Sequence, residues 1–371
     1  MRLLFLINTL DGGGAEKVLI DLVNNLDRKK YDITVQTLIN GGVFEKNLAP
    51  WVNYKPIISI RNKFLRHLFF YLISFILPPK LVYSLFIKSD YNLEIAYLQG
   101  APTRIVAASS NKNAKKLAFI HNDFSVSYKL NKSYKDINHC YEEYKGFDKV
   151  LFVSENAKEG FTKTIGELPN SSILHNVLDD ENVISMATKK INLPCSNGKF
   201  RFISVGRLVE QKGYDRLIEA VARLNKEGLE FEIWILGDGI DRKKLETLML
   251  ENNVNNILLF GFQENPYPFM KSCDMFICSS RNEGYSTVVT EAIILGLPIL
   301  TTDCAGMNEI LDDGNFGLII ENSIEGIYYG IKSILTEKYL YINYLQKAKE
   351  RSSYFSLKKT ISNYEELFDN V

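Results

Sequence analysis

The sequence predicts an α/β protein with two tandem doubly wound domains, each a parallel sheet with helices on both faces. The chain has 371 residues, which exceeds one typical hydrophobic core, so two domains are expected. Short apolar runs alternate with segments of helical periodicity, and this alternation starts again near Phe200. Such an alternation is typical of parallel sheets connected by helices.

The N-terminal domain is predicted over residues 1–177. It begins with a strand over residues 2–8, a glycine loop, and a helix over residues 17–26 whose apolar residues share one face. Later strands are predicted from apolar runs at 31–38, 93–98, 116–120 and 150–153.

The C-terminal domain is predicted over residues 178–354. A polar stretch over residues 177–199 is interpreted as an interdomain linker. Strands are then predicted at 200–205, 231–236, 257–260, 275–278 and 298–301, and helices at 214–224 and 242–251. A last helix is expected within about 355–371, with the N-terminal domain as one place where it could pack.

Composition excludes several classes of protein. Lys plus Arg and Asp plus Glu balance at 44 each, which argues against a globally basic nucleic-acid binder, so no nucleic-acid partner is expected. The five cysteines are odd in number and lack C-x-x-C spacing, which favours free thiols and a cytoplasmic location. The apolar N-terminal run is too short for a signal peptide. The four histidines show no metal-ligand spacing, so neither a metal nor a cofactor is expected.

The segment over residues 64–87 is more apolar than is usual for a soluble protein, because it is dense in aromatic and aliphatic residues, and it is flanked by basic ones. Pro78 and Pro79 divide it, and its uninterrupted part, 68–77, is too short to span a bilayer. Two interpretations stay open. One is an interfacial helix with basic anchors, which predicts peripheral membrane contact through about 60–88. The other is a core helix that covers the first sheet.

The most informative stretch contains two carboxylates, Glu283 and Glu291. The first follows a predicted buried strand, and the second lies about one turn into the next helix. In an open α/β sheet, ligands bind in the crevice at this end of the strands. The carboxylates can accept hydrogen bonds from vicinal hydroxyls of a sugar and a ribose. Backbone N–H groups near Ser286 and Thr287 can hold phosphate.

Two cations, Arg207 and Lys212, lie on another loop between a predicted strand and a helix. They can clamp a diphosphate, with Arg as a planar fork and Lys as a point charge, or they can be solvated loop charges. The glycine loop Gly12–Gly14 matches neither the G-x-G-x-x-G nor the Walker A pattern, so it is either a ligand loop or a tight turn. His121 ends a predicted strand, as a ligand-binding imidazole or a structural one.

In their order along the chain, these motifs resemble glycosyltransferase family four, retaining enzymes of the GT-B fold, in which two Rossmann-like domains face each other across a cleft. The resemblance covers nearly the whole chain except about 50–90. Its motifs are matched by Gly12–Glu16, His121, Gly206–Arg207 with Lys212–Gly213, Gly237–Gly239, Leu258–Gly261, and the Glu283 and Glu291 pair at E-x7-E spacing.

The resemblance implies a role for each matched position. Arg207 and Lys212 would bind the donor's diphosphate and stabilise the leaving nucleotide, while Glu291 would bind the ribose and Glu283 the donor sugar. Main-chain groups of three residues would lie beside the sugar and phosphate: Gly284, Tyr285 and Ser286. Residues of the opposite domain would complete the site, with two glycines near the phosphate and a histidine near the reacting side of the sugar: Gly13, Gly14 and His121. Many relatives have Phe or Leu and then Pro or Gly where Tyr285 and Ser286 stand, so the local sugar contacts stay open.

The function implied by the resemblance is a retaining transfer of a sugar from a nucleotide-diphosphate sugar, with UDP as the expected nucleotide. The acceptor would be a saccharide or a lipid-linked saccharide, as in the assembly of capsular or other bacterial surface polysaccharides at the inner face of the plasma membrane. Catalysis would depend on His121, Arg207, Lys212 and Glu283. Two alternatives stay open: a nucleotide-sugar epimerase on the same fold, and a non-catalytic nucleotide-sugar-binding protein at the membrane.

Overall fold

The computed structural model describes residues 1–87, 90–122, 124, 134–193 and 198–371. Its chain divides into two compact units. Unit 1 contains Met1–Leu178 together with Lys358–Val371, and unit 2 contains Asp179–Leu357. The chain therefore leaves the first unit once and returns to it for its last helix.

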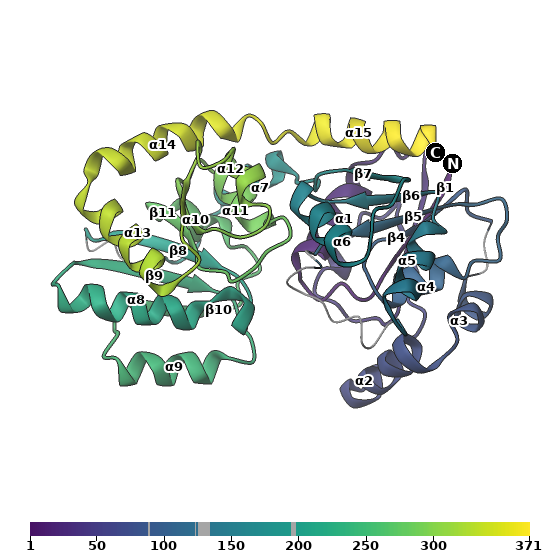
Figure 1. Ribbon diagram of the computed structural model, residues 1–371, viewed down its shortest axis with the longest axis horizontal. Coiled ribbons are helices and arrows are strands. Elements are labelled where there is room, and N and C mark those ends of the chain that lie inside the picture. The colour runs from purple at the N-terminus through teal and green to yellow at the C-terminus, as the bar shows by residue number, and fades with distance from the viewer. Residues whose placement is uncertain (88–89, 123, 125–133, 194–197) are drawn as a thin grey trace. The chain divides into compact units, whose positions relative to one another are not determined.

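Unit 1 is built on a parallel sheet of seven strands in the order β3-β2-β1-β4-β5-β6-β7 (Figure 1). The strands are β1 (Arg2–Ile7), β2 (Asp32–Thr37), β3 (Asn53–Tyr54), β4 (Leu93–Ala96), β5 (Lys115–Ile120), β6 (Lys149–Phe152) and β7 (Ser171–Ile173). The helices are α1 (Gly14–Asn25), α2 (Lys63–Tyr71), α3 (Pro79–Phe86), α4 (Ala101–Ala107), α5 (Ile137–Lys145), α6 (Glu155–Thr164) and α15 (Leu357–Asn370).

Different helices pack on the two faces of this sheet. Leu4 and Leu6 point into a core shared with side chains of α3, α4, α5 and α6. Phe5 points to the opposite face, where its ring lies 6.2 Å from the ring of Phe368 on α15. This alternation is the two-residue period of a strand that is buried on both faces.

Unit 2 has a parallel sheet of six strands in the order β10-β9-β8-β11-β12-β13. The strands are β8 (Phe200–Val205), β9 (Phe231–Leu236), β10 (Ile257–Gly261), β11 (Met275–Cys278), β12 (Ile299–Thr302) and β13 (Leu318–Ile320). The helices are α7 (Asp180–Ala187), α8 (Tyr214–Lys226), α9 (Arg242–Glu251), α10 (Tyr267–Lys271), α11 (Thr287–Ile294), α12 (Met307–Leu311), α13 (Ile324–Thr336) and α14 (Lys338–Ser352). Side chains of α8 and α13 share one core with this sheet.

The predicted interdomain linker over residues 177–199 is wrong in its first half, which forms α7 of unit 2. The side chain of Asp179 accepts a hydrogen bond from the backbone N–H of Asn182 and so caps the helix. Val183 and Ala187 are buried, and α7 packs on α10 and α11. Because only these two residues of the short helix are buried, its apolar pattern was too weak to predict a helix. Pro194 lies outside the described residues.

The apolar segment that begins at Phe64 forms a bent helical hairpin, not one helix. A π-helical turn over Leu72–Ile76 follows α2, and α3 begins at Pro79 after a 120° bend. In the part of the chain that the structure describes, no single helix is long and apolar enough to cross a membrane. Counted together, the two helical segments Phe64–Ile76 and Pro79–Phe86 have the length and composition of a membrane-spanning segment, but they are bent at the break between them.

Candidate functional site

The site of unit 2 is built on two loops that follow neighbouring parallel strands. The loop after β8 and the loop after β11 meet at the carboxyl edge of the sheet, as expected for adjacent strands. Ser279 Oγ donates to the carbonyl of Lys212 at 2.9 Å, and the N–H of Arg281 donates to the carbonyl of Gln211 at 2.8 Å. Gln211 Nε2 donates in return to the carbonyl of Asn282 at 3.0 Å. These bonds fix one loop against the other.

Glycine is required where these loops approach most closely. Gly213 has a φ of 65°, and a Cβ there would lie 2.1 Å from the carbonyl oxygen of Ser279. Gly306, on the loop after β12, has a φ of 78°, and its Cβ would lie 2.2 Å from the carbonyl oxygen of Gly284. Both positions combine left-handed backbone with backbone contact, so no other residue fits without displacing a loop.

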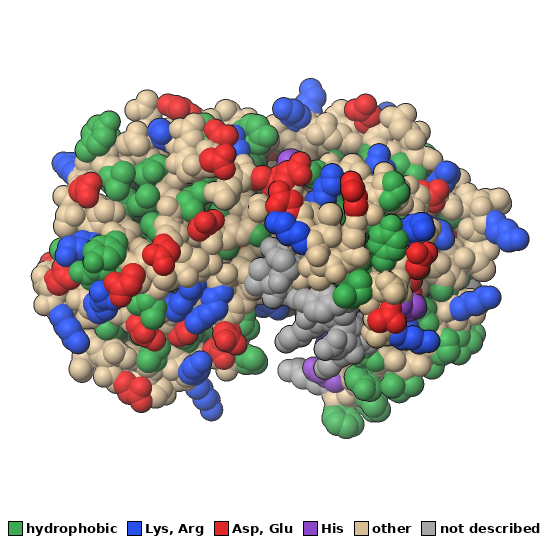
Figure 2. Space-filling view, in the orientation of Figure 1, with side chains coloured by type: hydrophobic (Ala, Val, Ile, Leu, Met, Phe, Trp, Pro, Cys, Tyr) green, Lys and Arg blue, Asp and Glu red, His purple; other side chains and the backbone are tan. Residues whose placement is uncertain are grey.

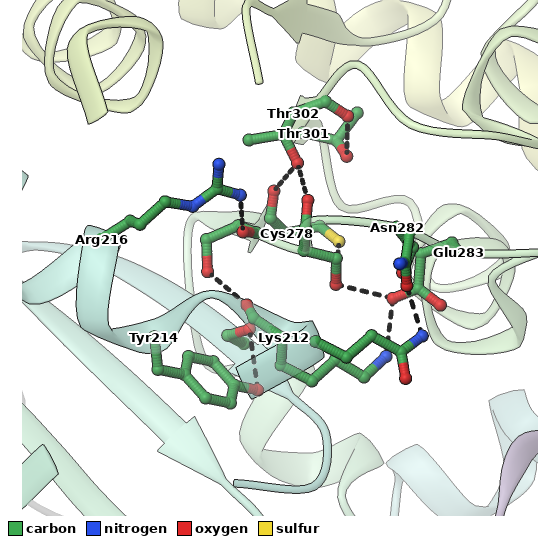
Figure 3. A network of polar contacts seen from close by, with 12 residues as sticks. Lys212, Tyr214, Arg216, Cys278, Asn282, Glu283, Thr301 and Thr302 are labelled. Atoms are coloured by element: carbon green, nitrogen blue, oxygen red, sulfur yellow. Dashed lines mark hydrogen bonds and ion pairs between the residues drawn. The ribbon is translucent and has the colours of Figure 1, made fainter. Parts of the chain in front are cut away.

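The Lys212–Glu283 ion pair lies at the centre of these loops (Figure 3). Lys212 Nζ donates to Glu283 Oε1 at 2.6 Å, and Ser280 Oγ donates to the same oxygen at 2.6 Å. The Lys212 and Glu283 side chains are 18% and 10% exposed. Burial lowers the pKa of Lys212, but the charge of Glu283 outweighs this effect, and the pKa is raised above its ordinary value. Lys212 therefore keeps its charge.

Arg207 differs from Lys212, although the sequence treats them as one pair of cations. Its side chain is exposed on the loop after β8. Among the described residues, it has no side-chain hydrogen bond or ion pair. The cation available to an incoming anion is therefore Arg207, whereas Lys212 is already paired with Glu283.

Glu291 lies on α11 and is only 5% exposed. Tyr267 OH, from α10, donates to Glu291 Oε1 at 3.0 Å. Sequence reasoning missed Tyr267, because nothing in a five-residue helix indicates that its first residue reaches a carboxylate 24 positions later. This hydroxyl fixes the orientation of the second carboxylate.

The three residues that follow Glu283 lead into the start of α11. Ser286 is the N-cap residue and is 3% exposed, but its side chain does not cap the helix. The first N–H groups of α11 therefore lack the usual side-chain acceptor. Burial raises the pKa of Tyr285, and the charge of Glu309 adds to the effect. Gly284 contributes its carbonyl to the close approach with Gly306.

The glycine loop of unit 1 leads from β1 into α1. Gly13 is the N-cap residue, and Gly14 is the first residue of the helix. The carboxylate of Glu16 lies beside this loop, with Oε2 2.2 Å from the place that a Cβ on Gly13 would occupy. A phosphate at the start of α1 would therefore meet a like charge unless Glu16 moves.

His121 follows β5 in unit 1 and is 9% exposed. Its ring centre lies 5.0 Å from that of Tyr97, and its Nε2 has no hydrogen-bond partner within the described ranges. Burial lowers the pKa of His121 to about 4, so the imidazole is neutral at pH 7.

The structure therefore divides the predicted site residues between the two units. Lys212 contacts Glu283 directly in unit 2, where Glu291 and the start of α11 follow on the same segment. Gly13, Gly14 and His121 belong to unit 1. Within residues 1–87, 90–122, 124, 134–193 and 198–371, no group of three or more His, Cys, Asp or Glu side chains could hold a metal ion.

Sequence comparison relates this chain to known glycosyltransferases. Residues 186–352 match the family of glycosyl transferases group 1. An uncharacterized glycosyltransferase of Methanocaldococcus jannaschii is 33% identical over 236 residues, which cover 62% of this chain and 57% of that protein. The N-acetylgalactosamine-N,N'-diacetylbacillosaminyl-diphospho-undecaprenol 4-alpha-N-acetylgalactosaminyltransferase of Campylobacter jejuni is 34% identical over 213 residues, or 56% of each chain. The chain thus spans little more than half the length of these curated relatives.

Solved structures show the fold of the whole chain. The crystal structure of Anabaena Alr3699/HepE in complex with UDP and glucose has a TM-score of 0.79, covers 100% of both chains and is 17% identical. The fold is therefore GT-B, with two Rossmann-like domains, which confirms the predicted fold class. The residues that match the glycosyl transferases group 1 family make up most of unit 2.

Proposed function

We propose that the protein is a retaining glycosyltransferase that moves a sugar from a UDP-sugar to a saccharide or lipid-linked saccharide acceptor. The observation that carries this proposal is the buried Lys212–Glu283 pair, followed by Glu291 on α11, in a glycosyl transferases group 1 domain. This arrangement offers one cation and two carboxylates at the edge of the sheet where ligands bind.

The donor's nucleoside and sugar are assigned to the two carboxylates. Glu291, oriented by Tyr267, accepts hydrogen bonds from the ribose hydroxyls. Glu283, held by Lys212 and Ser280, accepts from hydroxyls of the sugar. A carboxylate is suited to a vicinal diol because it has two acceptor oxygens.

The diphosphate is assigned to Arg207, to Lys212 and to the first N–H groups of α11. The ion pair of Lys212 and Glu283 is nearly neutral as a unit, so the added charge of Arg207 makes this edge attractive to an anion. Cleavage of the sugar–phosphate bond increases the negative charge on the departing diphosphate. Fixed cations stabilise that charge more in the transition state than in the ground state.

In the proposed reaction, the bond between the anomeric carbon and the diphosphate oxygen breaks, and a bond to the acceptor oxygen forms on the same face of the sugar. The acceptor's proton passes to the leaving phosphate. The neutral His121 donates or accepts a hydrogen bond through Nε2 near the reacting side of the sugar. As the resemblance implies, Gly13 and Gly14 would approach the phosphate, which requires that the carboxylate of Glu16 move away from this loop. The proposal requires no metal ion or cofactor, because Arg207 and Lys212 supply positive charge.

Two similar proteins support the choice of substrates. The Anabaena structure was solved with UDP and glucose, and the Campylobacter enzyme is named for transfer to a sugar on diphospho-undecaprenol. We therefore assign this chain to the assembly of surface polysaccharides, including capsules, with UDP as the donor nucleotide. The reaction takes place on the cytoplasmic face of the membrane, where such an acceptor is held by its lipid.

A donor panel tests the proposal. UDP-sugars should raise the melting temperature, and release of UDP should require an added acceptor. The anomeric configuration of the product, read by NMR, should match that of the donor. Formation of an epimer with donor alone would identify an epimerase instead. Binding of the donor without turnover on any acceptor would identify a non-catalytic protein.

Three variants locate the site. Arg207→Ala, Lys212→Ala and Glu291→Ala should each abolish or cripple transfer. Arg223→Ala, which removes an exposed arginine paired with Glu325 on another face of the same unit, is the control and should retain turnover. Normal turnover in all three site variants would refute the assignment.

A further inference from the structure

The inner side of the α2–α3 hairpin is part of the core of unit 1. Ile73, Val82, Tyr83 and Ile87 are buried in the cluster that covers one face of the sheet. Tyr83 OH donates to the buried carboxylate of Glu94 on β4 at 2.5 Å. The interpretation as a core helix therefore explains one side of the hairpin.

The outer side is apolar as well, although it is exposed. Of the twenty large hydrophobic side chains that are exposed among the described residues, seven lie on this hairpin. They are Phe64, Leu65, Leu68, Tyr71, Ile76, Leu81 and Leu85. Phe64 is 75% exposed, and Ile76 is 57% exposed. Figure 2 shows hydrophobic side chains gathered along the lower edge of unit 1, over α2 and α3. Such a concentration on one element indicates an interaction surface, not the scattered exposure normal for a soluble domain.

The charge of this region is equally uneven. Between Glu45 and Asp90 the sequence contains no Asp or Glu but seven Lys or Arg, although the charges of the whole chain balance. Among these cations, Lys55, Arg61 and Lys80 have exposed side chains. A segment that combines exposed apolar side chains with an excess of positive charge is complementary to an anionic lipid surface.

We propose that the outer side of the α2–α3 hairpin docks on an anionic lipid bilayer, with its apolar side chains in the interface and the flanking cations on the lipid headgroups. The hairpin lies on the bilayer and does not span it, because its inner side cannot leave the core without exposing Ile73, Val82 and Tyr83.

Docking would bring the membrane close to the glycine loop. Arg66 Nη2 on α2 lies 3.8 Å from Oδ1 of Asp11, the residue before Gly12. A lipid-linked acceptor could therefore reach this loop while its lipid stays in the bilayer. This consequence for the acceptor rests on the proposed transferase function, whereas the docking itself does not.

Vesicle co-sedimentation of the full-length protein, without donor or acceptor, tests the docking. Vesicles of phosphatidylcholine with about one third phosphatidylglycerol should bind the protein at least tenfold more tightly than pure phosphatidylcholine, and added salt should weaken the binding. The triple variant Phe64→Ser/Leu68→Ser/Leu85→Ser should lose at least tenfold in binding. The matched control is Ile240→Ser/Leu250→Ser/Phe262→Ser, which removes three exposed apolar residues of unit 2 and should bind like the original chain.

Hydrogen exchange in β1 and β4, which share a core with the hairpin, shows whether unit 1 of the triple variant is folded. Unchanged vesicle binding of a folded triple variant would overturn the proposal, as would equal binding to neutral vesicles. A change from dimer to monomer in light scattering, with no vesicle binding by the original chain, would show that a second copy covers this surface and would also overturn it. Lack of transferase activity in a chain that still binds vesicles would refute only the proposed function.

Discussion

Lys212 Nζ lies 2.6 Å from Glu283 Oε1, and the two residues come from loops that are 71 positions apart in the sequence. Both side chains are largely buried, and Ser280 donates to the same carboxylate oxygen. Removing one partner of such a pair leaves the other as an uncompensated, largely buried charge. The pair therefore links the stability of the loops to the proposed chemistry.

Replacing Lys212 alone should destabilise unit 2. Lys212→Met leaves Glu283 buried without its cation, and the free energy of unfolding should fall by about 3 kcal/mol. The double variant Lys212→Met/Glu283→Gln should regain most of this loss, because no charge then stays unpaired, but it should not regain transfer. Urea denaturation in a Trp51→Phe background measures the effect, since the buried Trp234 of unit 2 is then the one tryptophan left.

The control for this prediction is Arg223→Met, which breaks the exposed pair with Glu325. Its effect on unfolding should stay below about 1 kcal/mol, as is usual for surface ion pairs. An equal loss in the control, or a double variant as unstable as Lys212→Met, would show that the pair has no special role in the loops.

Tyr267→Phe should weaken nucleotide binding without unfolding the chain. The change removes only the hydroxyl that donates to Glu291 Oε1, so the carboxylate loses the hydrogen bond that orients it for the proposed ribose contact. We expect the Kd for UDP to rise about tenfold, which corresponds to the loss of one hydrogen bond to a charged group. Isothermal titration calorimetry measures this change.

A matched variant exists in the same unit. Tyr328 OH donates to the carboxylate of Glu227 outside the site, so Tyr328→Phe removes the same kind of contact without affecting the nucleotide. Equal affinities for UDP in the original chain and in Tyr267→Phe would remove Glu291 from the ribose site.

Much of the fold could be predicted from local sequence patterns. Strands such as β1 and β11 are buried on both faces, so their apolar runs are continuous and distinct from the flanking loops. Local motifs placed Lys212 and Glu283 on loops that follow strands, but their contact depends on β8 and β11 being neighbours, which only the structure shows.

Other features depend on tertiary contacts and left no such signal. The sequence grouped Arg207 with Lys212, but only the folded chain shows that one is exposed and the other is buried against Glu283. Tyr267 reaches Glu291 across helices whose packing is not encoded in either segment. The outer side of the hairpin was not separable from its inner side, since both are apolar. Phe69, Phe70 and Phe75, the aromatic residues most evident in the sequence, are half-buried.

The neutral state of His121 predicts a dependence of stability on pH. Its pKa in the folded chain is lowered by burial to about 4, from an ordinary value of 6.5. As the pH falls below 6.5, the unfolded chain binds a proton at this residue before the folded chain does, so stability is lost between pH 6.5 and pH 4. By pH 5 the loss from this residue should be about 2 kcal/mol.

A His121→Phe variant isolates this contribution. Urea denaturation of both chains at pH 7 and pH 5 gives two differences in the free energy of unfolding, and other titrating groups contribute to both. The loss of stability from pH 7 to pH 5 should be smaller by about 2 kcal/mol in the variant than in the original chain. Parallel pH dependence in the two chains would mean that folding does not lower the pKa of His121.

The last helix supplies a final prediction, because α15 completes the core of unit 1 although it follows unit 2 in the sequence. Phe368 is 1% exposed, and its ring centre lies 6.2 Å from those of Phe5 and Tyr31. Phe368→Ala should leave a cavity there and cost about 3–5 kcal/mol of stability. Hydrogen exchange should therefore accelerate in β1 and β2 but stay unchanged in β8 and β9.

The control Tyr339→Ala removes an aromatic residue of α14 that is 82% exposed and should change neither unit. If Phe368→Ala accelerated exchange equally in both units, α15 would have to stabilise the whole chain, whereas an effect confined to β1 and β2 places its contribution in the unit whose sheet it covers.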